Sequence, residues 1–456
     1  MRSTRRGGFD SHALSQVKKG LAPELETEAL DEAATADPGR TSMLAALDYR
    51  DFRLFWAGLV VSNIGTWMQQ FGLGWLVVQL AIQDGVPNLA PFYLGLTGLA
   101  RALPGLAFGL FGGVVADRAD RRRLLLVTQT SAAISAAVLG VLTISGRINI
   151  VEIVLISALN SIIFSFDAPT RQAMVPRLVS DRELMSAIGL NSAAFNGATL
   201  VGPLIGGVLI IPFGVGGLMV LNAVSYFAVV AALLVMRAQP VDTGRRAPML
   251  DSIREGLSYL RHDPVLRWVV ALSVATALLT RPYIQLLPAE AQFLGVGAVE
   301  LSWLLAASGA GALGGALITA SLGGWKHRGA LLVAAAFAHG SLLMLFGTQR
   351  SVLGALVFVG LTSFAVMVFL GMGNTLMQTR TPDALRGRVM SVNTMVFIGF
   401  MPLGQLVLGA VGTVAGINTA FLIGGIIVTA VALYAGLRVT ALREAVATPR
   451  PRAVAS

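Results

Sequence analysis

The chain has 456 residues, of which 55% are hydrophobic and 13% are charged. Soluble domains usually carry about a quarter charged residues, so this composition argues against a water-soluble globule. Cysteine is absent, which excludes disulfides and Cys-ligated metals, and the three lysines never follow glycine, so the Gly-Lys-Ser/Thr loop of ATP-driven pumps is missing. We expect no metal, no cofactor and no use of ATP.

The chain begins with residues 1–49, which are rich in Ala, Glu, Asp, Ser and Arg and lack sustained apolar periodicity. We predict a disordered cytoplasmic tail there. Twelve apolar segments of about 20 residues, each long enough to cross a bilayer, follow between Phe52 and Leu437. The predicted spans are 52–80, 91–116, 124–144, 151–174, 184–211, 218–236, 265–287, 301–322, 330–347, 352–376, 389–412 and 417–437.

A polar connection, residues 237–264, divides six spans from six. Its apolar residues recur at helical spacing, which predicts an amphipathic helix on the membrane surface; they are Leu250, Ile253, Leu257 and Leu260. We therefore predict an all-α integral membrane protein with twelve transmembrane helices in two pseudo-symmetric six-helix bundles, 50–236 and 265–438, followed by a second cytoplasmic tail, 439–456.

Internal repetition supports two related halves. The strings APTRQAMVPRLVSDRELMSA after span 4 and TLMQTRTPDALRGRVMSV after span 10 each give a Pro-containing basic loop followed by Met-Ser-small. Related halves commonly hold a solute between them near the bilayer midplane. Chance similarity of two basic loops is the alternative.

Positive charge marks one side of the membrane. Alternate connections carry eighteen Lys and Arg residues, whereas the other connections carry only Arg147 and Arg350. The positive-inside rule then predicts a multi-pass protein of the cytoplasmic membrane with both termini in the cytoplasm. The net charge of +10 reflects this topology and attraction to anionic lipid, and we expect no nucleic-acid partner.

Every third span carries a polar stripe on one helical face. Such a stripe suits a helix that faces a wet cavity, although it can equally bond to a neighbouring helix. We favour the cavity because the stripe recurs in spans 1, 4, 7 and 10, whose candidate residues are Asn63, Trp67, Gln70, Asn160, Phe164, Arg281, Gln285, Met367 and Asn374.

Two arginines, Arg101 and Arg281, lie inside predicted spans and away from their cytoplasmic ends, where an unpaired charge is costly. Arg101 falls in the outer half of span 2. It either binds an anionic or carbonyl-rich solute in the cavity or forms a buried structural contact. Arg281 precedes Pro282 near the outer end of span 7. A gate at a broken helix and a snorkelling anchor are equally open interpretations for Arg281.

A proton-coupled transporter needs a titratable group whose surroundings change with access. Asp167 and Glu290 are the available carboxylates, and we expect Glu290 to be solvated near the outer surface and Asp167 to act mainly in gating. His339 is alone in span 9, and a packed position suits it better than a proton relay.

The loop after span 2 carries the most specific motif of the chain, Gly113-x-x-x-Asp117-Arg118-x-x-Arg121-Arg122. This spacing resembles the major facilitator superfamily, whose loop between spans 2 and 3 has the same pattern. One departure is Asp120, which stands where the family usually has Gly.

The resemblance implies that Asp117 faces the start of span 11 near Arg388, and that Arg118 or Arg121 meets Asp167 on span 4. These contacts would form a cytoplasmic latch that breaks and re-forms as the halves rock. The alternative is that the arginines only enforce topology.

Span 5 carries a second pattern, which resembles that of proton-coupled exporters of the superfamily except that Ala198 replaces a Gly. Small residues at this spacing allow close helix approach, and a proline inside the span favours a kink. Plain helix packing is the alternative interpretation. The residues are Gly189, Ala198, Gly202, Pro203, Gly206 and Gly207.

Four longer strings are similar to the branch of the superfamily that contains enterobactin, macrolide and multidrug exporters: DFRLFWAGLVVSNIGTWMQ, FDAPTRQAMVPRLV, NSAAFNGATLVGPLIGG and PDALRGRVMSV. The similarity runs from about Asp48 to Arg438. It implies secondary active export of an amphiphilic small molecule, drug-like or siderophore, by alternating access with proton antiport. The alternative is a facilitator or importer of the same fold. An enzyme has less support, because the chain shows no His-Glu metal pair, Ser-His-Asp set or carboxylate cluster. A signalling receptor has less support, because the sequence contains no large soluble domain.

Overall fold

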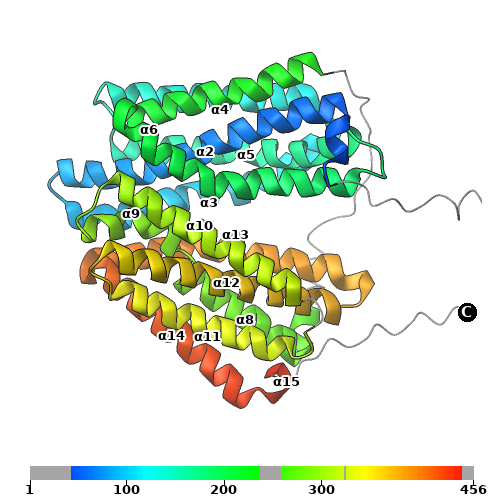
Figure 1. Cartoon of the computed structure of the whole chain (residues 1–456), viewed down its shortest axis with the longest axis vertical. Coiled ribbons are helices and arrows are strands. Elements are labelled where there is room, and N and C mark those ends of the chain that lie inside the picture. The colour runs from blue at the N-terminus through cyan, green and yellow to red at the C-terminus, as the bar shows by residue number, and fades with distance from the viewer. Residues whose placement is uncertain (1–42, 237–257, 323–324, 444–456) are drawn as a thin grey trace, which may run out of the picture.

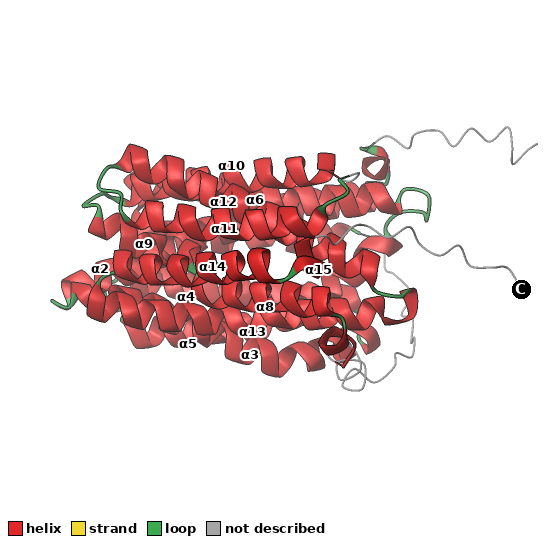
Figure 2. Ribbon diagram, turned by 90° about the horizontal axis from the view of Figure 1, so that it is seen from below, coloured by secondary structure: helices red, strands yellow, loops and turns green. Residues whose placement is uncertain are grey.

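The computed structural model describes residues 43–236, 258–322 and 325–443, and these residues form helices joined by short turns, with no strand among them (Figures 1 and 2). The long helices are α2 Arg50–Gln83, α3 Ala90–Arg118, α4 Arg121–Ile144, α5 Ile150–Met174, α6 Leu184–Val235, α8 Pro264–Leu279, α9 Tyr283–Phe293, α10 Ala298–Ser321, α11 Arg328–Gly347, α12 Val352–Arg380, α13 Asp383–Ala415 and α14 Ile417–Arg438. Short helices are η1 Ala45–Asp48, η2 Pro87–Leu89, η3 Val175–Arg177 and α15 Thr440–Arg443. The predicted tail 1–49 and linker 237–264 lie mostly outside the described residues.

Twelve membrane crossings account for these helices. In the described part of the chain, nine helical segments meet the length and hydropathy of a span, with α8 and α9 counted as one. One of the nine, α6, has 52 residues; at 1.5 Å per residue they add up to about 78 Å of helix, enough for two crossings. The 34-residue α2 and the 29-residue α3 complete the set.

The two crossings of α6 reverse direction at Gly214, whose φ of 65° lies in the left-handed region that favours glycine. Along α2, Gly58 meets Val229 and Gly72 meets Leu218, so the second part of α6 runs antiparallel to α2. The first part runs parallel to α2 and packs against it at Gly202 and Gly206. The loop expected between spans 5 and 6 is therefore reduced to a reversal within a nearly continuous helical segment.

Span 7 is broken, at the position where Arg281 precedes Pro282. The Thr276 carbonyl oxygen accepts hydrogen bonds from the backbone N–H of Thr280 at 3.1 Å and of Arg281 at 2.7 Å, which ends α8. Pro282 has no N–H to continue the helix and precedes the first residue of α9. The Arg281 side chain is thus carried by an irregular turn inside the membrane-spanning region.

Helices α2–α6 form one bundle and α8–α14 form the other, drawn above and below each other in Figure 1. We call the end of the molecule that carries η1 and α15 the near end, and the end that carries η2 and the α13–α14 turn the far end. One apolar cluster joins both bundles in the far part, from Met68 of α2 to Phe421 of α14. Two separate clusters, one per bundle, fill the near part. Among the described residues, the bundles therefore share an apolar core at the far end and have separate cores at the near end.

Candidate functional site

A cavity of about 350 Å³ lies between the two bundles, and both bundles contribute to its wall. It is lined on one side by α2, α3 and the first part of α6, and on the other side by α9, α10, α12, α13 and the turn before α9. Six of the residues predicted from the polar stripes and from the buried arginines line it: Trp67, Gln70, Arg101, Arg281, Gln285 and Met367.

The other four stripe residues lie elsewhere. Asn63 is buried within α2, and Asn374 of α12 accepts a long hydrogen bond of 3.4 Å from Asn393 of α13. On α5, Asn160 is half-buried and the ring of Phe164 is 54% exposed, with the Arg171 guanidinium 5.9 Å from its centre. The described residues of α5 contribute nothing to the cavity wall.

The chemical character of the cavity is positive and amphiphilic. Arg101 comes from the first bundle and Arg281 from the second, and none of the described residues that line the cavity is acidic. Trp67 and Phe195 form an edge-to-face pair with ring centres 6.0 Å apart, which gives one wall an aromatic surface.

Further hydroxyl and amide groups also line the cavity. Ser308 and Ser363 are linked at 2.7 Å, and Ser363 lies 2.5 Å from the hydroxyl of the fully buried Tyr283. Gln405 donates to the carbonyl oxygen of Leu94 at 2.8 Å and ties α13 to α3. Ser308 and Gln405 belong to spans 8 and 11, so the polar stripe that recurs in spans 1, 4, 7 and 10 gives no signal for them.

The far end of the cavity is closed by close helix packing. A Cβ atom at Gly98 of α3 would collide with the Gln405 side chain, and one at Gly409 of α13 would collide with the backbone of Pro91. At Gly207 of α6, a Cβ would overlap Ser302 of α10. No side chain larger than hydrogen fits at these contacts without a shift.

Toward the near end the same helices separate. A Cβ at Gly109 of α3, at Gly189 or Gly197 of α6, or at Gly387 or Gly399 of α13 would meet no described atom within 4 Å. The cavity is therefore closed at the far end, and the helices around it diverge toward the near end.

The span 5 pattern lies at a junction of three helices. Gly202 and Gly206 let α6 approach α2, since a Cβ there would come within 2.6 Å of Trp67 and 2.7 Å of Phe71. Gly207 faces α10 of the other bundle, and Ala198 is buried. Pro203 lines the cavity, and the backbone remains helical at this residue. The pattern thus contacts both bundles.

Asp167 is held within its own bundle. Its carboxylate accepts hydrogen bonds from Thr128 at 2.9 Å and Gln129 at 2.6 Å, both on α4, and forms an ion pair with Arg171 at 2.5 Å. Residues four apart on a helix are neighbours, which explains the pairing with Arg171.

The other residues predicted for the latch lie at the near end. Gly113, Asp117 and Arg118 are in the last turns of α3, and the side chains of Asp117 and Arg118 lie outside the described part of the structure. Arg121 begins α4, and Arg388 lies in the second turn of α13. Arg122 binds the C-terminal end of α6, with its guanidinium 2.5 Å from the Leu233 carbonyl and 2.9 Å from the Leu234 carbonyl.

Asp120, which departs from the family pattern, has a local structural role. Its carboxylate accepts a hydrogen bond from the Arg123 backbone N–H at 3.2 Å and caps the start of α4. Aspartate is among the preferred residues at this position, because its side chain satisfies a backbone donor of the first turn.

Glu290 requires a correction, since the expectation that it is solvated was wrong. It is fully buried on α9, and Asn418 of α14 donates to one of its oxygens at 3.3 Å. The second carboxylate oxygen has no partner among the described residues. The sequence suggested exposure because Glu290 follows the predicted end of span 7, but α9 continues to Phe293 and packs against α14.

His339 is a packed residue of α11. Its side chain is fully buried, and its Nδ1 lies 3.1 Å from the Thr362 carbonyl oxygen. Its ring centre is 6.3 Å from that of Tyr283. The histidine therefore lies behind the cavity wall and does not line the cavity.

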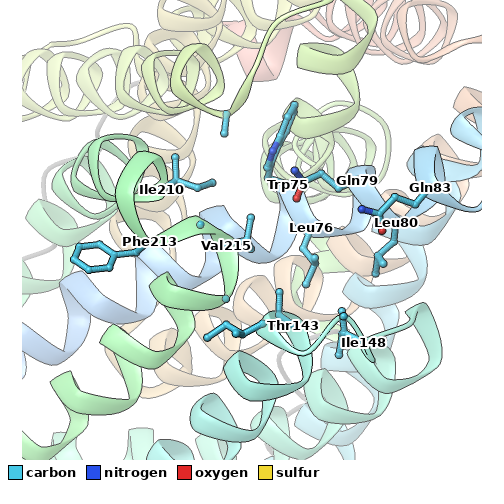
Figure 3. A pocket seen from close by; sticks show the side chains of 15 residues that line it. Trp75, Leu76, Gln79, Leu80, Gln83, Thr143, Ile148, Ile210, Phe213 and Val215 are labelled. Carbon is cyan, nitrogen blue, oxygen red and sulfur yellow. The ribbon is translucent and has the colours of Figure 1, made fainter.

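A second pocket, of about 550 Å³, lies at the far end beside the reversal of α6 (Figure 3). Trp75, Gln79 and Gln83 line it from α2, with Phe213 and Val215 on either side of Gly214. Apart from Ala298 of α10, its lining belongs to the first bundle alone. The cavity between the bundles is the better candidate site, because both bundles line it and it contains two arginines.

Comparison with known proteins identifies the family. The sequence pattern of the family described as transmembrane secretion effector, a branch of the major facilitator superfamily, matches residues 41–452. The multidrug efflux pump Tap of Mycolicibacterium fortuitum is 26% identical over 76% of this chain and 86% of its own length. The enterobactin exporter EntS of Shigella boydii is 25% identical over 75% and 82%.

Solved structures give the same fold. A bacterial homologue of the human lysosomal transporter Spinster, crystallised in an inward-facing and unoccupied conformation, matches with a TM-score of 0.64 at 14% identity, over 84% of this chain and 95% of that one. This similarity confirms the predicted fold of twelve helices in two bundles. Taken with the family match, it shows that the chain is a multi-pass membrane transporter for a small molecule and belongs to the transmembrane secretion effector branch of the major facilitator superfamily.

Proposed function

We propose that this protein is a proton-driven exporter that moves an amphiphilic small molecule out of the cytoplasm by alternating access. The observation that carries the proposal is the cavity between the bundles. Helices packed closely at glycine residues close its far end, and the helices around it diverge toward the near end. A solute can enter such a cavity from one side only, and rocking of the bundles would then expose it to the other side.

The near end is the cytoplasmic end in this proposal, and the membrane is the cytoplasmic membrane. Eighteen Lys and Arg residues occupy the connections assigned to that end, against Arg147 and Arg350 at the other. The tails 1–49 and 439–456 and the linker 237–264 would then all be cytoplasmic. Introduced cysteines test this: Gln83→Cys should react with an impermeant thiol reagent in intact cells, and Arg261→Cys should react only after permeabilisation.

Export, rather than import, is supported by the relatives. Tap and EntS are named as an efflux pump and an exporter, and the residues of the span 5 pattern contact both bundles. A facilitator or importer of the same fold is the competing function. Direction and energy coupling, not binding, separate these functions.

Protons are the coupling ion in this proposal, and ATP is not used. Glu290 is the leading candidate for the proton-binding group, since it is a buried carboxyl group with one unpartnered oxygen among the described residues. A titratable group that alternates between buried and hydrated surroundings binds protons with different affinity in the two states. Asp167 is the second candidate, although its three partners favour a structural role.

Transport in everted vesicles tests the function. Vesicles from cells that lack their own drug pumps should accumulate an amphiphilic compound when this protein is present and a proton gradient is imposed. An uncoupler should abolish the accumulation, and Gly207→Val, which crowds the contact between α6 and α10, should reduce it. Equal movement with and without the gradient would support the facilitator.

A further inference from the structure

The cavity contains two cationic side chains that have no acidic partner among the described residues. Arg101 and Arg281 both line it and are half-buried, one from each bundle. Neither guanidinium makes a hydrogen bond or an ion pair with another described residue. A cationic side chain inside a membrane protein usually pairs with an acidic group, because a lone charge in low-dielectric surroundings is unfavourable.

The buried acidic groups of the described helices are engaged elsewhere. Asp167 pairs with Arg171, and Glu290 bonds to Asn418, and neither carboxylate lines the cavity. The cavity wall, as far as the structure describes it, contains no acidic residue. Since no described residue supplies the opposing charge in the cavity, a molecule that enters the cavity can supply it.

The surrounding side chains restrict what can enter. Gln70 and Gln285 offer amide donors in the wall of the same cavity, and the Trp67–Phe195 pair and Met367 offer apolar surface. A planar guanidinium binds a carboxylate or a similar paired-oxygen anion through two parallel hydrogen bonds. The combination suits a molecule with an acidic, oxygen-rich head and an apolar body.

We propose that the cargo is an anionic amphiphile whose acidic oxygens contact Arg101 and Arg281 together, and that the cavity discriminates against cationic amphiphiles. Because the two arginines belong to opposite bundles, one bound anion links the moving halves. The inference rests on the proposed function, since it names the charge class of the exported molecule.

Binding to matched probes tests the charge preference. The protein is placed in nanodiscs of phosphatidylcholine, so that anionic lipid does not compete, and is titrated with three dansyl-labelled alkyl chains that end in a carboxylate, a neutral amide or an amine. We expect the carboxylate to bind about tenfold or more tightly than the amide, the effect of one charge-assisted hydrogen-bonded pair, and the amine to bind most weakly.

Three variants separate a binding role from a structural one. Arg101→Gln and Arg281→Gln should each weaken binding of the carboxylate about tenfold and leave the amide unchanged, whereas Arg101→Lys should restore part of the loss. Arg147→Gln, at an exposed far-end arginine outside the cavity, is the control and should change nothing. Equal loss for all three probes, or preference for the amine, would overturn the inference.

The outcomes for transport are distinct. Uncoupler-sensitive export of a cationic dye, with no preference for the carboxylate probe, would reject the anionic cargo and leave the exporter intact. Binding of the carboxylate that depends on both arginines, without any proton-driven export, would reject the exporter and support the assigned charge class.

Discussion

Gly98 of α3 lies directly against the side-chain amide of Gln405 of α13, with no room for a Cβ atom between them. Gln405 in turn donates to the carbonyl oxygen of Leu94, one turn earlier on α3, at 2.8 Å. This contact joins the two bundles at the far end, where the cavity closes. Separation of the bundles at that end must break it.

Replacement of Gly98 should therefore favour the conformation that opens at the far end. The Gly98→Val side chain would overlap Gln405, and such overpacking costs about 1–3 kcal/mol, a shift of roughly 5- to 150-fold between two conformations. The measurement is labelling of Leu305→Cys, inside the cavity, by an impermeant reagent added from outside. Gly109→Val on the same helix is the control, since a Cβ there meets no described atom within 4 Å. A similar rise in labelling in both variants would show that the contact between Gly98 and Gln405 does not keep the far end closed.

Much of the fold could be predicted from the sequence, because each span is an apolar segment with charged residues beyond its ends. The reversal at Gly214 was less visible, since 212–217 contains no charged residue and only a proline and glycines to interrupt the helix. Prediction of the cavity was partial for a physical reason. Gln405 and Ser308 line it because of how their helices are rotated in the bundles, and that rotation is set by packing among several helices. Burial of Glu290 likewise depends on the distant start of α14 and has no signal in the local sequence.

The near-end motif yields a second prediction, which rests on the proposed latch. Asp117→Asn removes one charge from the motif and should shift the population toward the conformation open to the cytoplasm, with protein abundance nearly unchanged. Labelling of Asn196→Cys, in the cavity wall, by an impermeant thiol reagent added from the cytoplasmic side should rise by roughly fivefold, as for a coupling of about 1 kcal/mol. Asp120→Asn is the matched control, because asparagine caps a helix as well as aspartate does. Unchanged labelling in the Asp117 variant would mean that the motif only sets the membrane topology and does not form a latch.

The span 5 pattern gives a third prediction, which separates folding from transport. Gly202→Val should destabilise the first bundle, because its Cβ comes within 2.6 Å of Trp67 and 3.0 Å of the Ile64 carbonyl oxygen in the same bundle. Gly207→Val should leave each bundle folded and impair transport, since it collides with Ser302 across the interface. Thermal unfolding in detergent and vesicle transport distinguish these effects. Gly189→Val, where a Cβ meets no described atom within 4 Å, should be neutral in both measurements.

The fourth prediction concerns the proposed coupling ion. Glu290→Gln preserves the shape of the side chain and its acceptor for Asn418 but cannot release a proton. We expect this variant to bind cargo with unchanged affinity and to exchange labelled for unlabelled cargo across vesicles, because exchange needs no net proton movement. Accumulation driven by a proton gradient should fall to the level of uncoupled vesicles. Asp84→Asn, an exposed carboxylate at the same end, is the control and should accumulate cargo as the unaltered protein does. Full gradient-driven accumulation by Glu290→Gln would exclude Glu290 as the proton-binding group and leave Asp167 as the next carboxylate to replace.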